Sequence, residues 1–513
     1  MKTTSDYFFL GCLSFFCCFF SCKSSLKENG QPPTTEYYTE KYRPQYHFTP
    51  EAKWMNDPNG MVYYDGEYHL FYQYYPDSTV WGPMHWGHAV SKDLVYWEHL
   101  PVALYPDSLG YIFSGSAVVD KGNTSGLGKD GKDPMVAIFT HHHIEGEKAG
   151  RVDFQYQSLA YSNDKGRTFN KFDGNPVVKN PGIKDFRDPK VFWYDQNKQW
   201  VMVLAAYDKA LFYMSPDLKN WTQTGTFGIP GDKRLWECPD LFPIRIEGTQ
   251  EQKWVLIVSI QQQAPNGGTA TAYFVGDFDG KTFTGDNKNQ KWLDYGTDNY
   301  AMVTWSGSPD KRILSIGWMS NWQYAQQVPT LKWRSAMTLP RELKLFKQDN
   351  DYMLHSLPVD ELSAIESKTT TIGSHNLKEN PFVTDISGTS KFDFSFEKPD
   401  SGVVNIRFSN TNGEYLDVGY DANTKSYFVD RTFAGKSDFN QDFARKHYGR
   451  TGYKHDSVDM LINLDHASVE LFADGGQCVM TDIFFPSVPF THMDISGNVI
   501  LKRGSSSTLK RIW

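Results

Sequence analysis

One short segment occurs four times in the first part of this chain, and the repeat restricts the folds open to it. The copies occupy residues 91–97, 162–169, 215–221 and 276–283, and in each an aspartate precedes an aromatic residue. Their starts are 71, 53 and 61 residues apart. Taken singly, such a segment is a common hairpin tip. Four copies favour a structural repeat, and four-stranded units recurring at roughly 40–60 residues are typical of a β-propeller.

The sequence around the third copy predicts the repeating unit. Residues 191–194, 199–207 and 211–214 are mostly apolar and read as three strands separated by short polar turns. A fourth strand at the edge would complete one antiparallel sheet. At this period residues 46–345 hold five sheets, so we expect an all-β chain that begins with a five-bladed β-propeller.

The remainder of the chain has a different pattern. A polar stretch at 346–370 predicts a linker. Beyond it, in residues 371–513, segments such as 391–396 and 403–408 alternate apolar and polar side chains, which indicates strands with one buried and one solvated face. Two such sheets packed together form a β-sandwich. We therefore expect a C-terminal β-sandwich after the propeller.

The N-terminus predicts export. An apolar run of 14 residues ends before Cys22, which suits a signal peptide over residues 1–22 better than a membrane span. Ser21 before Cys22 is typical of a lipoprotein signal, so Cys22 is the expected lipidation site. Phe19 and Phe20 are bulkier than the residues usual at these positions of a lipoprotein signal. A plain export signal and a retained membrane anchor therefore remain alternatives. Polar residues 23–45 would then be a tether between the lipid on Cys22 and the folded body. We expect this lipid to be the protein's only contact with the membrane.

Composition narrows the class of partner. Aromatic residues make up 15% of the chain, with 15 Trp and 29 Tyr, which favours strands and sugar-stacking surfaces. The net charge is −8 and no stripe of Lys and Arg interleaves with the aromatics, so nucleic acid is not an expected partner. Beyond the leader only Cys238 and Cys478 remain besides Cys22, too few for a disulfide scaffold.

Three carboxylates stand in unusual settings. Asp57 lies in residues 54–60, a stretch rich in turn formers that predicts a tight turn and that begins with Trp54. Asp188 follows Arg187, whose charge would lower the pKa of the carboxyl group. Glu237 lies between Trp236 and a cysteine, and apolar neighbours raise the pKa of a carboxyl group as a general acid requires. Each alone has an ordinary structural explanation. Inner strands of successive blades converge on one axis, however, so the three can meet in one site.

These motifs resemble those of glycoside hydrolase family 32, which contains invertases, inulinases and levanases. The resemblance rests on residues 54–60, 187–189 and 237–239 and covers nearly all of the chain beyond the leader. Further similar segments are residues 81–88, 113–116 and 430–432. The family's fold is a five-bladed propeller followed by a β-sandwich, which agrees with the repeat and the alternation.

The resemblance implies a role for each acid. Asp57 is similar to the family's nucleophile, Glu237 to its acid/base and Asp188 to its transition-state stabiliser, with Arg187 orienting the carboxylates. A double displacement that retains configuration would follow, with the Asp57 and Glu237 carboxyl groups about 5–5.5 Å apart. The resemblance also implies a substrate-binding set, in which Trp322 is an alternative to Trp318: Asn56, Gln73, Trp81, Phe113, Ser114, Arg187 and Trp318.

No cofactor is expected. Adjacent histidines on a strand point to alternate faces, so His141, His142 and His143 would be poor metal ligands, and we place them on a loop near the rim of the pocket. No other metal cluster or phosphate-binding loop is visible. Cys238 is interpreted as a small apolar neighbour of the acid/base.

The expected substrate is a fructose-containing oligo- or polysaccharide. Residues 239–241 and 81–104 look more like bacterial levanases and exo-inulinases than plant invertases, and a polymer suits an exported enzyme. We favour an exo-acting β-fructosidase that releases terminal fructose. Endo-levanase or endo-inulinase action, preference for sucrose and fructosyl transfer stay open. One rival is a non-catalytic fructan-binding lipoprotein, and the presence of all three acids argues against it. Another is a five-bladed arabinan-type hydrolase, and the context of Asp57 in residues 56–60 argues against that.

Overall fold

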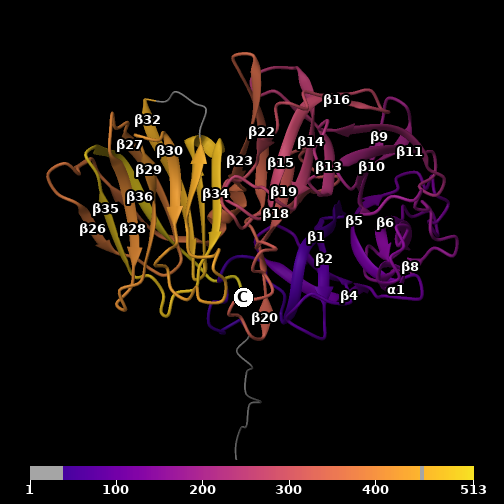
Figure 1. The fold of residues 1–513 in the computed structure, drawn as a ribbon, viewed down its shortest axis with the longest axis horizontal. Coiled ribbons are helices and arrows are strands. Elements are labelled where there is room, and N and C mark those ends of the chain that lie inside the picture. Colours follow the sequence, from indigo (N-terminus) through magenta and orange to yellow (C-terminus); the bar gives the residue numbers. More distant parts are fainter. Residues whose placement is uncertain (1–37, 451–455) are drawn as a thin grey trace, which may run out of the picture. The chain divides into compact units, whose positions relative to one another are not determined.

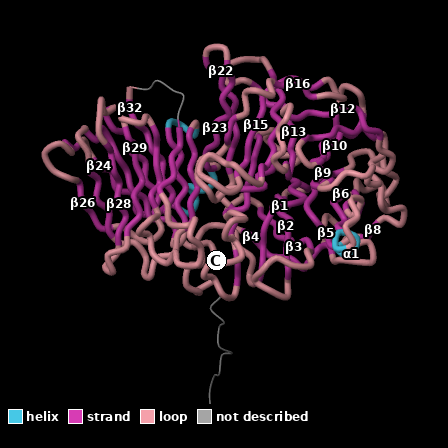
Figure 2. The backbone as a smooth tube through the Cα atoms, in the orientation of Figure 1, coloured by secondary structure: helices cyan, strands magenta, loops and turns pink. Residues whose placement is uncertain are grey.

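The computed structural model describes residues 38–450 and 456–513 (Figure 1). Strands dominate this part of the chain (Figure 2), and its helices are the short α1 (Ile144–Lys148) and the 3-10 turns η1 (Asp360–Ile365) and η2 (Asp474–Gly476). No helix in the described ranges has the length and apolar character to cross a membrane. The all-β prediction is confirmed. The predicted leader 1–22, with Cys22, lies outside the described residues.

The first part of the chain forms five successive antiparallel sheets, the blades of the propeller. Blade one contains β1 (Lys53–Tyr64), β2 (Glu67–Tyr75), β3 (His85–Ser91) and β4 (Trp97–Leu104). Blade two contains β5 (Tyr111–Val119), β6 (Met135–His142), β7 (Gln155–Ser162) and β8 (Asn170–Lys171). Blade three contains β9 (Phe186–Tyr194), β10 (Gln199–Ala206), β11 (Lys209–Ser215) and β12 (Thr222–Gly228).

The last two blades carry small additions. Blade four contains β13 (Trp236–Arg245), β14 (Gln252–Ile260), β15 (Ala270–Phe278) and β16 (Phe283–Gly285), with β17 (Lys291–Trp292) paired to β15. Blade five contains β18 (Tyr300–Thr304), β19 (Ile313–Met319), β22 (Arg341–Gln348) and β23 (Asp351–Pro358), with β21 (Ala336–Met337) paired to β19. The short β20 (Trp333–Arg334) adds to β1 in parallel, so a late segment completes the first blade.

The first strands of the five sheets form a closed ring. β1 contacts β5, β5 contacts β9, β9 contacts β13, β13 contacts β18, and β18 contacts β1 again. This closure defines the propeller axis, and residues far apart in sequence meet along it. The predicted five-bladed propeller is confirmed.

The repeated segment is the turn between the third and fourth strands of blades one to four. In the first copy Asp93 Oδ1 accepts hydrogen bonds from the backbone N–H groups of Val95 and Tyr96. Asp164, Asp217 and Asp279 accept backbone N–H groups at the equivalent turns. The aspartate recurs because it satisfies backbone donors that the turn leaves unpaired.

The segment 346–370, predicted as a linker, is not one. It holds the end of β22, all of β23, η1 and the start of β24 (Glu366–Ile372), and β22 pairs with β23 from Arg341 to Pro358. The polar residues near Asp349 are the tip of this hairpin and not a chain between domains. The fifth blade thus extends to Pro358. Residues near the end of the predicted tether 23–45 also pack on the body, since Arg43 is buried and donates to Thr49 and to the carbonyl group of Pro50.

The C-terminal part forms the expected β-sandwich. One sheet contains β24, β25 (His375–Asn376), β27 (Ser390–Glu397), β32 (Ser457–Asp465), β33 (Ser468–Ala473), β34 (Cys478–Ile483) and β36 (Ile500–Leu509). The other contains β26 (Phe382–Asp385), β28 (Val403–Ser409), β29 (Tyr415–Asp421), β30 (Ser426–Asp430), β31 (Lys446–Arg450) and β35 (His492–Ser496). Phe392, Phe394 and Phe396 of β27 are fully buried in a core shared by both sheets, which explains the alternation in the sequence.

Candidate active site

All five inner strands carry a β-bulge, at which two of their residues stand opposite one residue of the neighbouring strand. On β1 the bulge lies between Met55 and Pro58, so Asn56 and Asp57 face the single residue Gln73. The stretch 54–60 is therefore a bulged strand and not the tight turn that its composition predicted. Proline is tolerated inside a sheet at such irregularities, where the ladder of hydrogen bonds is already interrupted.

The other four inner strands repeat this arrangement. Register shifts occur between Ile112 and Gly115 on β5, Arg187 and Lys190 on β9, Glu237 and Asp240 on β13, and Tyr300 and Val303 on β18. Three residues at these bulges have positive φ: Asp188 (65°), Cys238 (45°) and Ala301 (53°). Such conformations are costly for non-glycine residues and concentrate at functional sites. The bulges direct Asp57, Ser114, Asp188 and Glu237 into one cavity.

This cavity has a volume of about 230 Å³ and contains all three predicted acids. Six of the seven predicted substrate-binding residues also line it, namely Asn56, Gln73, Trp81, Phe113, Ser114 and Arg187. The seventh, Trp318, does not. It is fully buried and packs against Trp54 and Trp322, and Trp322 lines the cavity in its place. The reason is that Trp318 lies within β19, whereas Trp322 lies on the loop that follows.

Asp57 is held by three side chains. Ser114 Oγ donates to Asp57 Oδ2 at 2.7 Å, and Asn56 Nδ2 donates to Oδ1 at 3.0 Å. The buried indole of Trp54 donates to Asn56 Oδ1 at 2.7 Å, which turns the amide NH₂ group toward Asp57. The thiol of Cys238 donates to Asp57 Oδ2 at 3.4 Å. Burial raises the pKa of Asp57 above its usual range; the hydrogen bond from Ser114 opposes this shift, and the charge of Glu237 adds to it.

Glu237 is clamped through both carboxylate oxygens. Arg187 donates to Oε1 from Nε at 3.2 Å and from a terminal nitrogen at 2.9 Å. The hydroxyl group of Tyr300 donates to Oε2 at 2.5 Å. Arg187 also donates to Asp185 at 2.6 Å, so its own plane is fixed from the other side. The acid therefore has one defined orientation in the cavity.

Asp188 differs from its sequence-based prediction. Arg187 does lie near it, with Nε 3.9 Å from Asp188 Oδ2, and lowers its pKa. Burial nevertheless dominates, and together with the charges of Glu237 and Asp57 it raises the pKa of Asp188 to about 7. The backbone N–H of Cys238 donates to Asp188 Oδ2 at 3.0 Å, so the bulge on β13 orients this carboxyl group.

Several residues in or beside the cavity were not identified from the sequence. Tyr300, which bonds to Glu237 from beside the cavity, follows a polar run before β18, and no motif distinguishes it from a core tyrosine. Lining residues that were not predicted are Glu147, Gln155, Asp185 and Gln261.

The histidines lie partly as expected. His142 lines the wall and stacks on Phe113 with ring centroids 4.2 Å apart, whereas His141 is buried and bonds to Ser158. Both residues lie on β6 and not on the expected loop.

Three carboxyl groups in one propeller cavity, with an arginine clamp and aromatic walls, define a glycosidase-type site. The comparisons with known proteins agree: residues 47–358 match the glycosyl hydrolases family 32 N-terminal domain, and residues 359–512 match the family's C-terminal domain. The chain belongs to glycoside hydrolase family 32. The boundary between the two matches falls at the end of β23.

Individual relatives support the assignment. The chain is 49% identical to a levanase of Bacillus subtilis over 500 residues, covering 93% of this chain and 72% of the levanase. It is 39% identical to an extracellular exo-inulinase of Aspergillus niger over 501 residues, covering 89% and 91% of the two chains. Among solved structures, an exo-inulinase from Aspergillus awamori superposes with a TM-score of 0.85 at 36% identity, covering 93% of this chain and 100% of the exo-inulinase.

Proposed function

We propose that this protein is an exo-acting β-fructosidase that removes terminal fructose from fructans with retention of configuration. The observation that carries the proposal is a pair of acids in one cavity, each held by its own hydrogen bonds. Ser114 and Asn56 donate to Asp57. Arg187 and Tyr300 donate to Glu237. The relatives described as levanase and exo-inulinase support fructan as the substrate.

In the first step Asp57 attacks the anomeric carbon, C2, of a terminal fructosyl unit. The bond between C2 and the leaving oxygen breaks as Glu237 gives that oxygen a proton, and a fructosyl-enzyme ester on Asp57 results. In the second step Glu237 takes a proton from water, the water oxygen attacks C2, and the ester bond to Asp57 breaks. Fructose leaves, and both acids return to their starting states.

The mechanism assigns the proton of the first step to Glu237. Burial, together with the charges of neighbouring carboxylates, raises the pKa of Asp57 and raises that of Asp188 to about 7. Asp188 would stabilise the positive charge that develops on the fructosyl ring when it is ionised, and its fixed bond to Cys238 N aims it at the ring.

The exo-inulinase relatives support exo action, since the extracellular exo-inulinase of Aspergillus niger is 39% identical over 89% of this chain.

We further propose that the protein is exported and held at a bacterial membrane by a lipid on Cys22. The apolar leader and the extracellular exo-inulinase relatives support export.

Product analysis on levan, inulin and sucrose tests the proposal. We expect fructose as the only product from fructan at the earliest time points, with overall retention detected by NMR. A mixture of oligosaccharides at those times would contradict exo action. The Asp57→Ala variant should release no fructose; release at the wild-type rate would refute the proposed nucleophile.

A further inference from the structure

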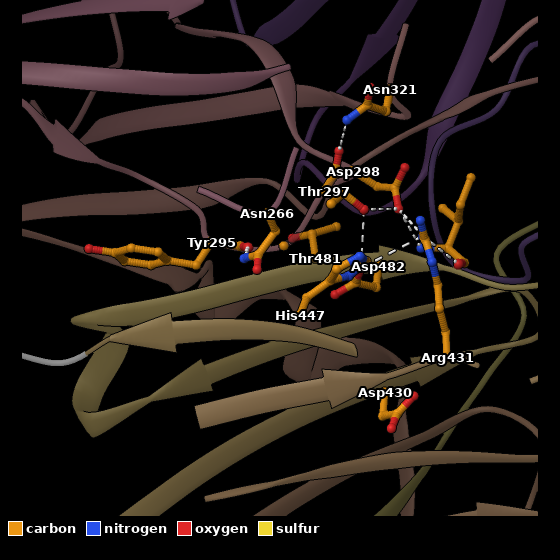
Figure 3. A network of polar contacts seen from close by, with 12 residues as sticks. Asn266, Tyr295, Thr297, Asp298, Asn321, Asp430, Arg431, His447, Thr481 and Asp482 are labelled. Carbon is orange, nitrogen blue, oxygen red and sulfur yellow. Dashed lines mark hydrogen bonds and ion pairs between the residues drawn. The ribbon is translucent and has the colours of Figure 1, made fainter. Parts of the chain in front are cut away.

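A buried polar network joins the sandwich to two segments beside the active site (Figure 3). Its centre is Arg431, which follows β30 and is fully buried. The guanidinium group donates to Asp298 Oδ2 at 2.6 Å and to the hydroxyl group of Tyr324 at 3.0 Å. It also donates to backbone carbonyl groups of the sandwich at Phe443 and Ile483, so it is fixed on its own side.

Both propeller partners of Arg431 lie next to residues of the cavity. Asp298 is two residues before Tyr300, whose hydroxyl group donates to Glu237. The backbone N–H of Asp298 donates to the carbonyl oxygen of Thr481 in β34, so the sandwich also contacts this segment through the backbone. Tyr324 belongs to the loop 320–328, which carries Trp322 into the cavity wall. The Tyr324 hydroxyl group donates to Asp298 Oδ1 at 2.6 Å and ties the two segments together.

A second sandwich residue holds the same loop independently. Asn440 Nδ2 donates to the carbonyl oxygen of Gln323 at 3.0 Å and to Gln327 Oε1 at 2.8 Å. Gln323 is the residue directly after Trp322. The loop is thus bonded on one side by Arg431 through Tyr324 and on the other by Asn440.

The propeller also holds this loop, since Asn321 Nδ2 donates to the carbonyl oxygen of Thr297 at 2.8 Å. Trp322 itself packs on two buried tryptophans. Its ring stacks on Trp54 with centroids 6.0 Å apart and meets Trp318 at 4.8 Å. Both of those rings are fully buried, whereas Trp322 is partly exposed at the cavity. Packing on Trp54 and Trp318 limits how far the Trp322 ring can move toward the core. The position of the loop backbone determines where in the cavity wall the ring lies.

We propose that Arg431 and Asn440 are positioning residues for substrate binding: through the loop 320–328 the sandwich sets the place of Trp322 in the wall of the fructosyl pocket. The inference rests on the proposed function of the cavity. It gives the sandwich a role in the site although, among the described residues, none from the sandwich lines the cavity. A contact made equally to substrate and to transition state changes KM and leaves kcat alone.

The first test is the Asn440→Ala variant, since Asn440 lies at the surface and its loss leaves the core intact. We expect KM to rise by about three- to tenfold, which corresponds to about 0.7–1.4 kcal/mol of binding free energy. We expect kcat within about twofold of wild type and an unchanged Tm. The matched control is Asn412→Ala, another surface asparagine of the sandwich, which donates to Ser487 and should leave KM unchanged. An unchanged KM in Asn440→Ala would refute the proposal.

A double-variant cycle tests whether the effect passes through Trp322. In a Trp322→Ala background, Asn440→Ala should no longer alter KM, since the ring that it positions is absent. A KM effect that persists undiminished there would overturn the proposal. Tyr324→Phe, which keeps the Arg431–Asp298 ion pair, should raise KM as Asn440→Ala does, but with a lower Tm because its buried hydrogen bonds to Asp298 and Arg431 are lost. Wild-type protein that releases no fructose from levan, inulin or sucrose would refute the proposed function instead.

Discussion

The hydrogen bond from Ser114 to Asp57 gives a direct test of the assigned nucleophile. This bond is 2.7 Å long, partly buried, and made to a carboxylate that must be ionised to attack. A hydrogen bond to a charged group contributes about 1.5–3 kcal/mol, and about 1.4 kcal/mol corresponds to one pKa unit. In Ser114→Ala, complete loss would raise the pKa of Asp57 by about one to two units. Asn56 and the Cys238 thiol still donate, so we expect about one unit.

The sign of the effect on activity follows from the step that Asp57 performs. Below its pKa the nucleophile is protonated and inactive, so the acidic limb of the kcat/KM profile should move to higher pH by about one unit. On the plateau the loss should be smaller, under about tenfold, because the carboxylate loses its charge as the ester forms and the hydrogen bond weakens with it. Initial rates of fructose release across the acidic range give the profile.

A matched control separates this effect from general damage to the strand. Ser116 is also buried on β5, but its Oγ accepts from the backbone N–H of Val191 and touches no acid. Ser116→Ala should lower stability and leave the acidic limb in place. If Ser114→Ala also leaves the limb unmoved, Asp57 is not the group whose ionisation the reaction requires, and the mechanism proposed above fails.

Three further predictions follow from the same structure. Glu237→Gln should reduce the rate of fructose release from fructans by about 10²–10⁴-fold. The initial rate on a fructoside whose leaving group needs no proton should fall much less, so initial rates on the two substrates test the assignment. Gly60→Ala should lower the free energy of unfolding by about 1–3 kcal/mol, because φ is +55° there and a Cβ would lie 2.6 Å from a ring carbon of β2; a denaturant titration measures it. Burial lowers the pKa of His47, but the carboxylates of Asp465 and Glu470 outweigh it and raise the value to about 9. Its contribution to stability, about 3 kcal/mol, is therefore complete below pH 6.5 and is lost as pH rises through 9, so the Tm difference between wild type and His47→Gln should shrink above pH 9.

The fold was predictable because its signals are local. The aspartate of each repeated turn satisfies backbone N–H groups within three or four residues, so its meaning is contained in a short segment. The alternation of Phe392, Phe394 and Phe396 likewise reports burial on one face of one strand. The linker prediction failed for a related reason: charged residues at the tip of the β22–β23 hairpin have the same composition as a linker, and only the pairing across the turn distinguishes them.

The pocket was predictable only in part, because two of its features depend on distant contacts. Trp318 and Trp322 are four residues apart and chemically identical, and their exposure is decided by where β19 ends. The direction of the Asp188 pKa shift depends on burial and on Glu237 and Asp57, residues remote in sequence, which together outweigh the adjacent Arg187. A neighbour in sequence therefore gave the wrong sign.

Three of the five bulges could have been predicted from the sequence. Asp57 and Asp188 each precede a proline, and Glu237 stands two residues before one. A proline in an otherwise strand-like run argues for an irregularity in the ladder, and a bulge reorients the side chains beside it. Three acids, each within two residues of a strand proline, thus predict three side chains turned out of the regular alternation of the strand. The bulges on β5 and β18 carry no proline, and only the register of β5 with β6 and of β18 with β19 reveals them.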